Sequence, residues 1–412
     1  MATSGQPVDL LALFDPAVRA DPYPLYARVR EASPMMVGGG QVAVVAGYDD
    51  CLAVLRHPRA LSDRRRSAVF RRAAAMADSV PTGMRWAVET PSFLFLDPPD
   101  HTRLRRLVAQ AFTARRVEQL RPTIEGLTAD LLDAAGSEMD VVGELAYPLP
   151  LTVIADLLGV PRADTPRLRE WSAVLTRALD PYIALTGQPA EGLEHRMAAL
   201  TEFREYFQRL VERRRRDPGD DLVSALTAAE DGGDRLSSEE LLSTCVLLLV
   251  AGHETTVNLI ANGVLALLRH PGQFAMLATN PGLAPGAVEE VLRYDPPVQL
   301  LMRVAGEDLS VGATTVPSGS VVLLLLAAAS RDPAVNEEPD RFDIGRTQLR
   351  HLAFGFGAHF CLGAPLARIE AQVALAAFAR RFPQARAVSS ELRYRDNVTL
   401  RGLTQLRVLT GG

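Results

Sequence analysis

The sequence predicts a mainly α-helical protein with a minor β region, organised as one large domain of 412 residues. Helical patterns dominate the stretch from about residue 98 to about residue 270. Around 298–326 the composition changes to β-branched runs separated by turn residues, which is typical of strands. No internal repeat, low-complexity linker or domain boundary is visible, so one large core is the simplest organisation.

The elements can be placed in order along the chain. Pro22 and Pro24 start an amphipathic segment that runs to residue 30, as helix N-termini allow. A short strand is predicted over 41–46, between glycines. Proline-bearing breaks divide the long helical region near 148–150, 161–166, 181 and 218. A last helix is expected over 364–380, and short β segments are expected near 392–409.

Composition excludes several classes of protein. A formal net charge of -5 gives no basic field for nucleic acid. Three scattered cysteines do not make a disulfide framework or a four-thiolate zinc site, which favours a reducing cytoplasm. The N-terminus lacks the basic leader and apolar core of a signal peptide. The longest apolar stretch, 241–251, is shorter than the roughly 20 residues of a membrane span. We expect a soluble, cytoplasmic monomer without a transmembrane segment.

The most informative segment is the loop from Phe354 to Gly363, with one cysteine, Cys361. Its glycines suit a backbone that bends tightly and lets a flat group approach closely. A lone thiolate can bind one metal, and soft sulfur suits iron, including the iron of a haem. A single buried cysteine is usually only a small apolar side chain, so the surrounding pattern must decide. Cys51 and Cys245 have no such pattern and are expected in the core.

A second segment, Ala251 to Thr256, is expected in the middle of a buried helix. Ser237 and Glu240 have the spacing of a capping box at its start. Burying Glu254 and Thr255 in such a helix is costly, and an acid beside an alcohol can relay protons. A zinc-protease motif is excluded, because Val257 stands where the second histidine is required.

These two segments carry a family resemblance. The pattern Phe-x-x-Gly-x-x-x-Cys-x-Gly, with His two residues before the Cys, resembles the haem-binding signature of cytochrome P450s, and Ala-Gly-His-Glu-Thr-Thr resembles their oxygen-binding helix. The resemblance covers almost the whole chain and implies the P450 fold with haem b and O2. It implies Cys361 as the axial iron ligand, and Glu254 and Thr255 as the pair that delivers protons to O2. The other cofactor-binding residues implied in the loop are Phe354, Gly355, His359 and Gly363.

The resemblance extends to charged residues elsewhere in the chain. Glu290 and Arg293 resemble the Glu-x-x-Arg of P450s, and Arg341 supplies the arginine that completes the buried network of that family. The haem propionates need cations, and the resemblance gives this role to His101, Arg105, Arg303 and His359. His101 and Arg105 are four residues apart and share one helix face. Arg103 and Arg106 are expected at the surface or facing a redox partner. His351 is expected to pack near the loop without binding metal.

The resemblance implies a monooxygenase that takes up two electrons and two protons and inserts one oxygen atom of O2 into a hydrophobic substrate. No dinucleotide fingerprint is present, and only 51 residues follow Cys361, so we expect no fused reductase. Electrons would pass from NAD(P)H through a ferredoxin reductase and a ferredoxin. A peroxide-driven or oxygen-independent relative is a rival, although the Glu254–Thr255 pair argues against it. A non-catalytic haem-binding module is a second rival.

The expected substrate pocket is apolar, which suits a sizeable hydrophobic ligand. The family members that this chain most resembles, which carry Ala-Gly-His-Glu-Thr-Thr, often act on macrolides and other natural products. The resemblance therefore favours tailoring of a macrolide or another secondary metabolite, while terpenoids and xenobiotics stay open as substrates. Residues 64–92 are expected to form a mobile connection that covers the pocket. The candidate lining residues are Phe93, Leu94, Leu247, Leu248, Ala251, Val298, Leu300, Val398 and Thr399.

Overall fold

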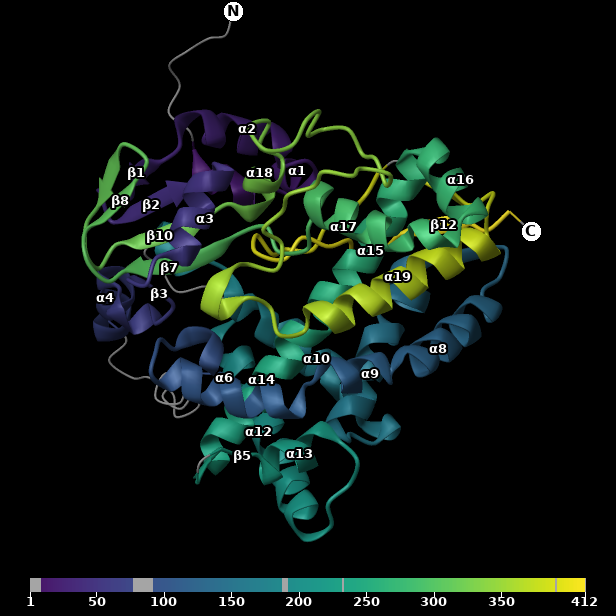
Figure 1. Ribbon diagram of the computed structural model, residues 1–412, viewed down its shortest axis with the longest axis horizontal. Coiled ribbons are helices and arrows are strands. Elements are labelled where there is room, and N and C mark those ends of the chain that lie inside the picture. The colour runs from purple at the N-terminus through teal and green to yellow at the C-terminus, as the bar shows by residue number, and fades with distance from the viewer. Residues whose placement is uncertain (1–8, 77–91, 187–191, 232, 390, 412) are drawn as a thin grey trace, which may run out of the picture.

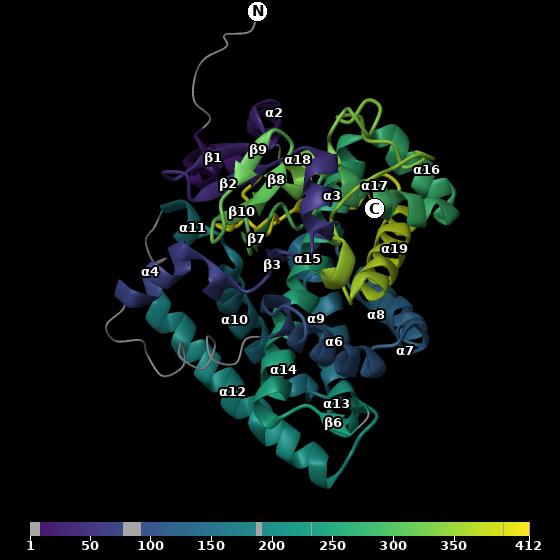
Figure 2. The same ribbon diagram turned by 60° about the vertical axis from the view of Figure 1, so that its left-hand side comes forward.

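The computed structural model describes residues 9–76, 92–186, 192–231, 233–389 and 391–411. Most of the labelled strands lie at the left in Figure 1, with β12 at the right and β5 at the bottom, and helices make up most of the rest. The long helix α12 (Leu193–Arg216) runs along the lower edge, away from the sheet (Figure 2). The prediction of a mainly α-helical fold with a minor β region is confirmed.

The larger sheet joins strands from the first quarter of the chain to two strands between residues 301 and 324. Its order is β1 (Met35–Val37), β2 (Val42–Val45), β10 (Val321–Leu324), β7 (Leu301–Ala305) and β3 (Ala60–Leu61). Only the β2–β10 pair is parallel. Every residue of β2 and of β10 is buried, which explains their continuous apolar sequences. The strand predicted at 41–46 and the β region at 298–326 are both confirmed, the latter including the hairpin of β8 (Leu309–Val311) and β9 (Thr314–Val316).

A smaller sheet joins β11 (Arg386–Ala387), β12 (Arg407–Leu409) and β4 (Glu138–Asp140). Strand β4 lies inside the region predicted as helical, so that prediction was incomplete. Three residues give too little alternation to be recognised in the sequence, and their pairing with the distant β12 decides the conformation. A hairpin of β5 (Glu230–Asp231) and β6 (Asp234–Arg235) was also missed, because two residues per strand are too few to show alternation.

The prolines separate helices where the sequence predicts breaks. Pro148 begins one helix, and the other three predicted breaks fall between helices. The helices before the centre of the chain are α1 (Pro16–Ala20), α2 (Tyr23–Ala32), α3 (Tyr48–Arg56), α4 (Ala68–Met76), α6 (Asp100–Ala111), α7 (Ala114–Glu118), α8 (Arg121–Asp133), α9 (Pro148–Leu158), α10 (Thr165–Leu175) and α11 (Tyr182–Thr186). The later ones, after α12, are α13 (Leu222–Ala228), α14 (Ser238–Gly252), α15 (Glu254–Arg269), α16 (Pro271–Thr279), α17 (Ala284–Tyr294), α18 (Leu326–Ser330) and α19 (Ala364–Arg381).

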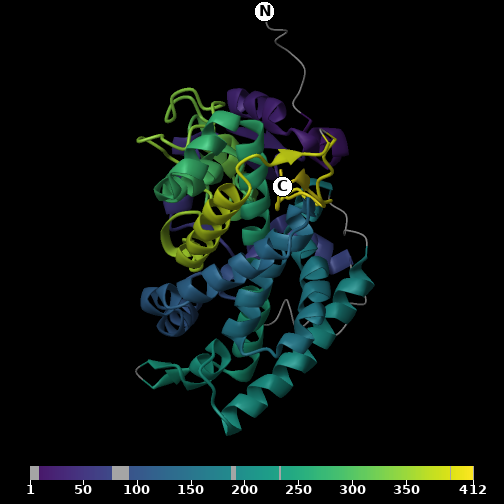
Figure 3. The same cartoon turned by 90° about the vertical axis from the view of Figure 1, so that its right-hand side faces the viewer.

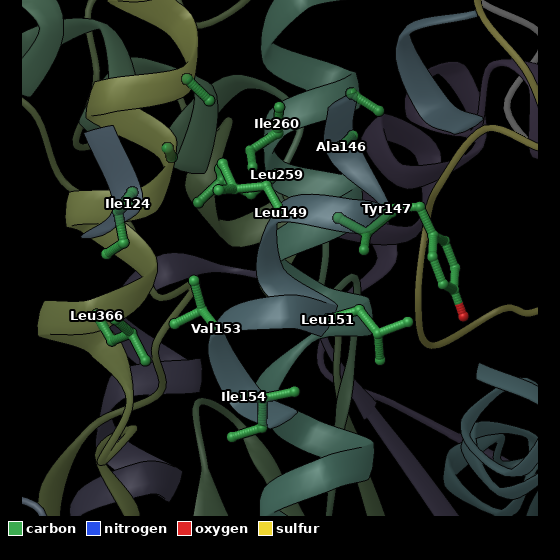
Figure 4. Packing of buried hydrophobic residues seen from close by; sticks show 14 of the residues in the cluster. Ile124, Ala146, Tyr147, Leu149, Leu151, Val153, Ile154, Leu259, Ile260 and Leu366 are labelled. Carbon is green, nitrogen blue, oxygen red and sulfur yellow. The ribbon is translucent and has the colours of Figure 1, made fainter. Parts of the chain in front are cut away.

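Helix α15 forms the centre of the core. All of its residues from 256 to 267 are buried, and α19, α17 and α9 pack against it. Figure 4 shows Leu149 and Val153 of α9 beside Leu259 of α15, with Leu366 of α19 on the other side. Two stretches, Val141–Leu158 and Ser238–Arg269, are long and apolar enough to cross a membrane, but 72% and 67% of them is buried inside the fold. Such burial is what core helices of a globular protein show.

The buried helix predicted through Ala251–Thr256 is in fact two helices. Helix α14 starts at the predicted capping box of Ser237 and Glu240, and it ends at Gly252. His253 follows with φ -109° and ψ -45°, and α15 begins at Glu254. The Thr255 hydroxyl donates to the Ala251 carbonyl at 2.8 Å, and Thr256 donates to Gly252 at 3.3 Å. These side chains occupy carbonyls of the last turn of α14, which is how hydroxyls bend helices.

The C-terminal segment contacts the N-terminal helices through Arg401. Arg401 donates to the Ala20 carbonyl at 3.0 Å and to Asp295 at 2.8 Å. Figure 3 shows the yellow C-terminal segment close to the purple N-terminal helices, in the upper half of the molecule. Of the connection predicted over 64–92, the structure describes a short 3-10 turn (Arg64–Arg66) and helix α4, whereas residues 77–91 with Trp86 lie outside the described ranges.

Candidate active site

The cysteine loop connects a 3-10 turn (Gly357–His359) to α19 and places Cys361 three residues before that helix. Gly355 and Gly357 have φ +67° and +71°, a region in which a Cβ atom is strained. The Cys361 amide donates to the Phe354 carbonyl at 2.9 Å and closes the loop. Gly363 has φ -80°, so the bend itself does not require a glycine there, and its predicted role of letting a flat group approach closely stays a prediction.

The environment of Cys361 combines burial, which dominates, with groups that stabilise a thiolate. Burial raises the pKa of the Cys361 thiol. The backbone amides of Gly363 and Ala364 hydrogen-bond to it, and Arg105 lies near it, and these effects oppose the rise. Amides at the start of the 18-residue α19 supply the positive end of its helix dipole. In contrast, Cys51 and Cys245 are fully buried in the core as predicted.

Four basic side chains gather beside the loop. The rings of His101 and His359 lie 4.0 Å apart between centroids. Among the described residues, neither ring nitrogen of the buried His101 has a hydrogen-bond partner. Burial lowers the pKa of Arg303 to about 10. Burial, together with the charge of Arg303, lowers the pKa of Arg64 to about 10 as well. We call His101, His359, Arg303 and Arg64 the basic cluster.

The basic cluster fits an anionic ligand. Burial, Arg303 and His101 together lower the pKa of His359 to about 3, and its Nε2 atom lies 3.0 Å from the Ser62 hydroxyl. The two histidines are therefore neutral at pH 7 and can donate hydrogen bonds, whereas the buried Arg303 stays charged and is stabilised by a negative group. A haem fits the residues present, because its two carboxylates would meet the basic cluster while its iron meets the single thiol of Cys361. Arg105 donates to the Phe360 carbonyl beside the thiol.

The face of α14 and α15 near the loop is the uncovered one. Ala251 is exposed and Thr255 is partly exposed, whereas His253 and Glu254 between them are buried. Leu247 and Leu248, one turn earlier, are also partly exposed, as are Leu94 and Val298. Their exposure leaves them able to contact a ligand, and their role as lining residues stays a prediction. Four other candidates are buried at 6% exposure or less and pack in the core, which corrects the prediction: Phe93, Leu300, Val398 and Thr399.

Glu254 is fixed on the side of the helix away from Thr255. Its carboxylate accepts from Arg395 at 2.7 Å and from the Tyr147 hydroxyl at 3.3 Å. The acid and the alcohol therefore lie next to each other in the sequence but bond to different partners, because Thr255 donates to the Ala251 carbonyl. Direct transfer between them needs a bridging group such as water.

The buried network behind the site differs from the prediction in one arginine. Glu290 and Arg293 are fully buried and form two hydrogen bonds, at 2.7 and 2.8 Å. Arg341 does not join them, because its side chain is 58% exposed and pairs with Glu338. The third arginine is Arg346, whose Nε atom lies 3.5 Å from Glu290. The neighbouring Phe342 fills the core and turns Arg341 outward, so only the Arg341 carbonyl reaches Arg293, at 3.0 Å.

One further histidine and two arginines near the loop have roles other than metal binding. His351 hydrogen-bonds to Glu289 at 3.1 Å, which is the packing role predicted for it. Arg103 pairs with Asp234 at 3.2 Å and also with Glu240, and Arg106 is exposed. Within the described ranges, no three His, Cys, Asp or Glu side chains are grouped to hold a metal ion. Binding through one thiolate is a different arrangement, and it needs no such group.

Comparison with known proteins decides the family. The sequence matches the family described as Cytochrome P450 over residues 34–280 and 283–397.

The chain belongs to the cytochrome P450 family. Its cofactor is therefore expected from the family, whose members hold haem iron through a thiolate and use O2 with electrons from redox partners. The residues around Cys361 fit that cofactor, for the reasons given above.

Named relatives cover nearly the whole chain of this P450. The ligand-free crystal structure of Mycobacterium smegmatis CYP164A2 is 52% identical with a TM-score of 0.90, and the match covers 97% of this chain and 99% of that one. The cytochrome P450 monooxygenase PikC of Streptomyces venezuelae is 43% identical over 98% of this chain and 95% of its own. The 6-deoxyerythronolide B hydroxylase of Saccharopolyspora erythraea is 39% identical, covering 95% and 96%. This P450 is a monooxygenase.

Sequence reasoning missed several residues at the site of this P450. Arg64 belongs to an Arg-Arg-Arg run that was interpreted as part of a connection, although its guanidinium lies 4.3 Å from the centre of the Phe95 ring. Arg395 and Tyr147 both donate to Glu254 of α15, but they lie more than 100 residues from it in the sequence, at positions without a local motif. Arg346 follows Arg341 by five residues, and only the path of the intervening turn distinguishes them. No sequence pattern would have identified these partners.

Proposed function

We propose that this P450 hydroxylates or epoxidises a sizeable hydrophobic natural product, of the macrolide or polyketide class. The single observation that supports the substrate class is the similarity, over nearly the full chain, to 6-deoxyerythronolide B hydroxylase. The partly exposed Leu94, Leu247, Leu248, Ala251 and Val298 support an apolar ligand held by shape.

The proposed cofactor is haem b, with Cys361 as the axial ligand. His101, Arg303 and His359 of the basic cluster would bind the propionates, with Arg105 next to the thiol. Arg64 joins this proposal as a further cation. Phe354, Gly355 and Gly363 would shape the loop against the ring. When bound, the haem activates O2 and supplies the oxygen atom that is transferred, while the protein binds, orients and supplies protons.

Thr255 and Glu254 would supply those protons. The Thr255 hydroxyl is on the uncovered face, where it can hydrogen-bond to a ligand and pass on a proton. Glu254 would replenish that proton through water, because its carboxylate is held 2.7 Å from Arg395 and does not bond to Thr255 directly. This pair has no evident use in an enzyme driven by peroxide, which brings its own protons.

Electrons would come from NAD(P)H through a ferredoxin reductase and a ferredoxin. The P450 that receives them would be a cytoplasmic monomer with a single domain. An arginine face near the loop supports an acidic partner, since the guanidinium of Arg56 lies 4.6 Å from the exposed ring of Phe356, and Arg106 is exposed on α6. Such charges mainly raise the rate of encounter.

The test combines binding and turnover. Macrolide lactones, terpenoids and fatty acids are titrated into the purified holoenzyme while the haem Soret band is recorded. Compounds that shift the band are then incubated with O2, ferredoxin, its reductase and NAD(P)H. We expect a lactone to gain one oxygen atom. Conversion of terpenoids alone would overturn the substrate class, and conversion with peroxide but not with O2 would overturn the proton and electron supply.

A further inference from the structure

A buried chain of hydrogen bonds extends from Glu254 away from the uncovered face. The Tyr147 hydroxyl lies 3.3 Å from Glu254 Oε1 and 3.2 Å from His253 Nε2. His253 Nδ1 lies 3.3 Å from the Ser172 hydroxyl and 3.2 Å from the Leu249 carbonyl. Tyr147, His253 and Ser172 are all 4% exposed or less. Figure 4 shows the Tyr147 ring turned away from Leu149 and Val153, with its hydroxyl at the far end.

The protons of this chain can be arranged in two ways, and Glu254, Tyr147 and His253 keep hydrogen-bond partners in both. With ionised Glu254, the Tyr147 hydroxyl donates to the carboxylate and accepts from His253 Nε2–H, while Nδ1 accepts from Ser172. With protonated Glu254, the acid donates to the Tyr147 oxygen and Tyr147 donates to Nε2. The Nδ1–H of His253 then donates to the Leu249 carbonyl. His253 is neutral in both arrangements.

The surroundings of His253 agree with a neutral ring. Burial lowers the pKa of His253, the neighbouring Glu254 opposes this, and two cations lower it further. These cations are Arg395, from the C-terminal segment, and Arg169 of α10, whose guanidinium lies 4.5 Å from the centre of the Tyr147 ring. Tyr147, just before α9, is the remaining titratable group in contact.

We propose that Tyr147 and His253 are positioning residues which let Glu254 alternate between carboxylate and carboxylic acid without moving. The proposal rests on the proposed role of Glu254 as a proton donor, and it adds the reason why that acid can be reused. Conversion takes up one proton from solvent water at His253 Nδ1, while the Nε2 proton passes to the Tyr147 oxygen and the Tyr147 proton passes to Glu254. Glu254 then gives its proton to the substrate site, and no bond to carbon changes. Only the direction of two hydrogen bonds and the tautomer of His253 reverse, so a buried acid pays no desolvation penalty for a lost partner.

The test is Tyr147→Phe, which keeps the ring and removes the hydroxyl. Infrared spectra of the resting holoenzyme are recorded over a range of pH, and the spectra of Glu254→Gln are subtracted from them. The difference gives the pH at which half of the Glu254 carboxylate is converted to the carboxylic acid. We expect this midpoint to move to higher pH by about 1, because the carboxylate loses a charge-assisted hydrogen bond that is stronger than the neutral one lost by the acid. Tyr206→Phe is the matched control, since it removes a tyrosine–carboxylate bond of 2.7 Å to Asp164 at a remote place.

Turnover separates this proposal from the role of Glu254. Product formed per NAD(P)H should fall about 3- to 10-fold in Tyr147→Phe. Tyr147→Phe should have no further effect in the Glu254→Gln background. An unchanged infrared midpoint in Tyr147→Phe would overturn the positioning role, whatever the turnover. Normal product yield in Glu254→Gln would instead overturn the proposed function of the acid, and the infrared result would still stand.

Discussion

At the scale of single residues, Cys361 carries the strongest expectation. Its thiol is prepared by the amides of Gly363 and Ala364, and a hydroxyl in its place is a much harder and weaker donor to iron. In Cys361→Ser we expect loss of the thiolate absorption band of the reduced CO complex and of all product formation. Cys245→Ser, in the core, should keep the band and lose only stability. A normal CO band in Cys361→Ser would contradict the assignment.

Thr255 gives a second prediction at this scale. Within the described ranges its hydroxyl donates to the Ala251 carbonyl, and it lies on the uncovered face, where its oxygen can accept a hydrogen bond from another group. In Thr255→Ala, NAD(P)H consumption should continue while product per NAD(P)H falls about tenfold. Thr256→Ala, in which a buried hydroxyl is removed, should keep the product yield. Equal yields in Thr255→Ala and the wild type would contradict the relay.

Among individual residues, the sequence identified those that belong to continuous motifs. Cys361, Gly355 and His359 could be placed because ten consecutive residues form one loop, and Thr255 because its neighbours form one helix turn. Leu300 was misplaced, since adjacent residues of an extended segment point to opposite sides and its neighbour Leu301 is the partly exposed one. Register of this kind is set by tertiary packing.

At the scale of elements, Arg346 holds together the segment between α18 and the cysteine loop. Its Nη1 atom donates to the Glu337 carbonyl at 2.7 Å, and its Nε atom lies 3.5 Å from Glu290. Arg346→Ala should therefore leave a buried acid short of a partner and lower the stability of the holoenzyme by about 3 kcal/mol. Arg341→Ala, at the position predicted from the sequence, should have a much smaller effect, because its ion pair with Glu338 is exposed to solvent. Thermal unfolding, followed by loss of haem absorption, distinguishes the two variants. Equal losses of stability would show that Arg341 contributes to the buried network as much as Arg346 does.

Helix α19 carries an acid that gives stability a defined pH dependence. Burial raises the pKa of Glu370 to about 8, and among the described residues its Oε2 atom has no partner. Between the pKa of about 4.3 in the unfolded chain and about 8, the unfolded state releases this proton and the folded state keeps it. Stability from this group is therefore complete below about pH 4 and falls as the pH rises towards 8.

Glu370→Gln tests this pH dependence, because the amide stays neutral at every pH in this range. The melting temperature of the variant should exceed that of the wild type at pH 8, and the difference should shrink towards pH 5. Glu125→Gln, at an exposed position of α8, is the control and should change neither. A difference that is constant with pH would show that Glu370 is already ionised in the folded protein.

The elements also show where prediction from sequence ends. The helix break at His253 follows from bonds of Thr255 and Thr256 to carbonyls of the preceding turn, which helical periodicity does not reveal. Strand β4 exists because Met139 pairs with Val408, more than 250 residues later. Long helices with proline boundaries were recognised, since those signals are local.

At the scale of the whole molecule, Asp180 joins three segments that are distant in the sequence. Its Oδ1 atom accepts from the amides of Val398 and Thr399 at 3.0 and 2.9 Å, and the Thr399 carbonyl accepts from the Gln299 amide at 2.9 Å. The segment before α11, the chain leading to β7 and the C-terminal segment are thus held together. Val298, a proposed lining residue, pairs with Leu400 in the same place.

Asp180→Ala should release this junction. The amides of Val398 and Thr399 would lose a charged acceptor, so their hydrogen exchange should accelerate at least tenfold, and stability should fall by about 2 kcal/mol. Substrate affinity should fall as well, because Val298 loses the support of its pairing partner. Asp180→Asn is the matched control, since the amide oxygen can still accept from both backbone groups. If Asp180→Asn destabilises the protein as much as Asp180→Ala, the negative charge holds the junction and the two hydrogen bonds do not; if neither variant changes exchange, the junction is held by apolar packing around Val398.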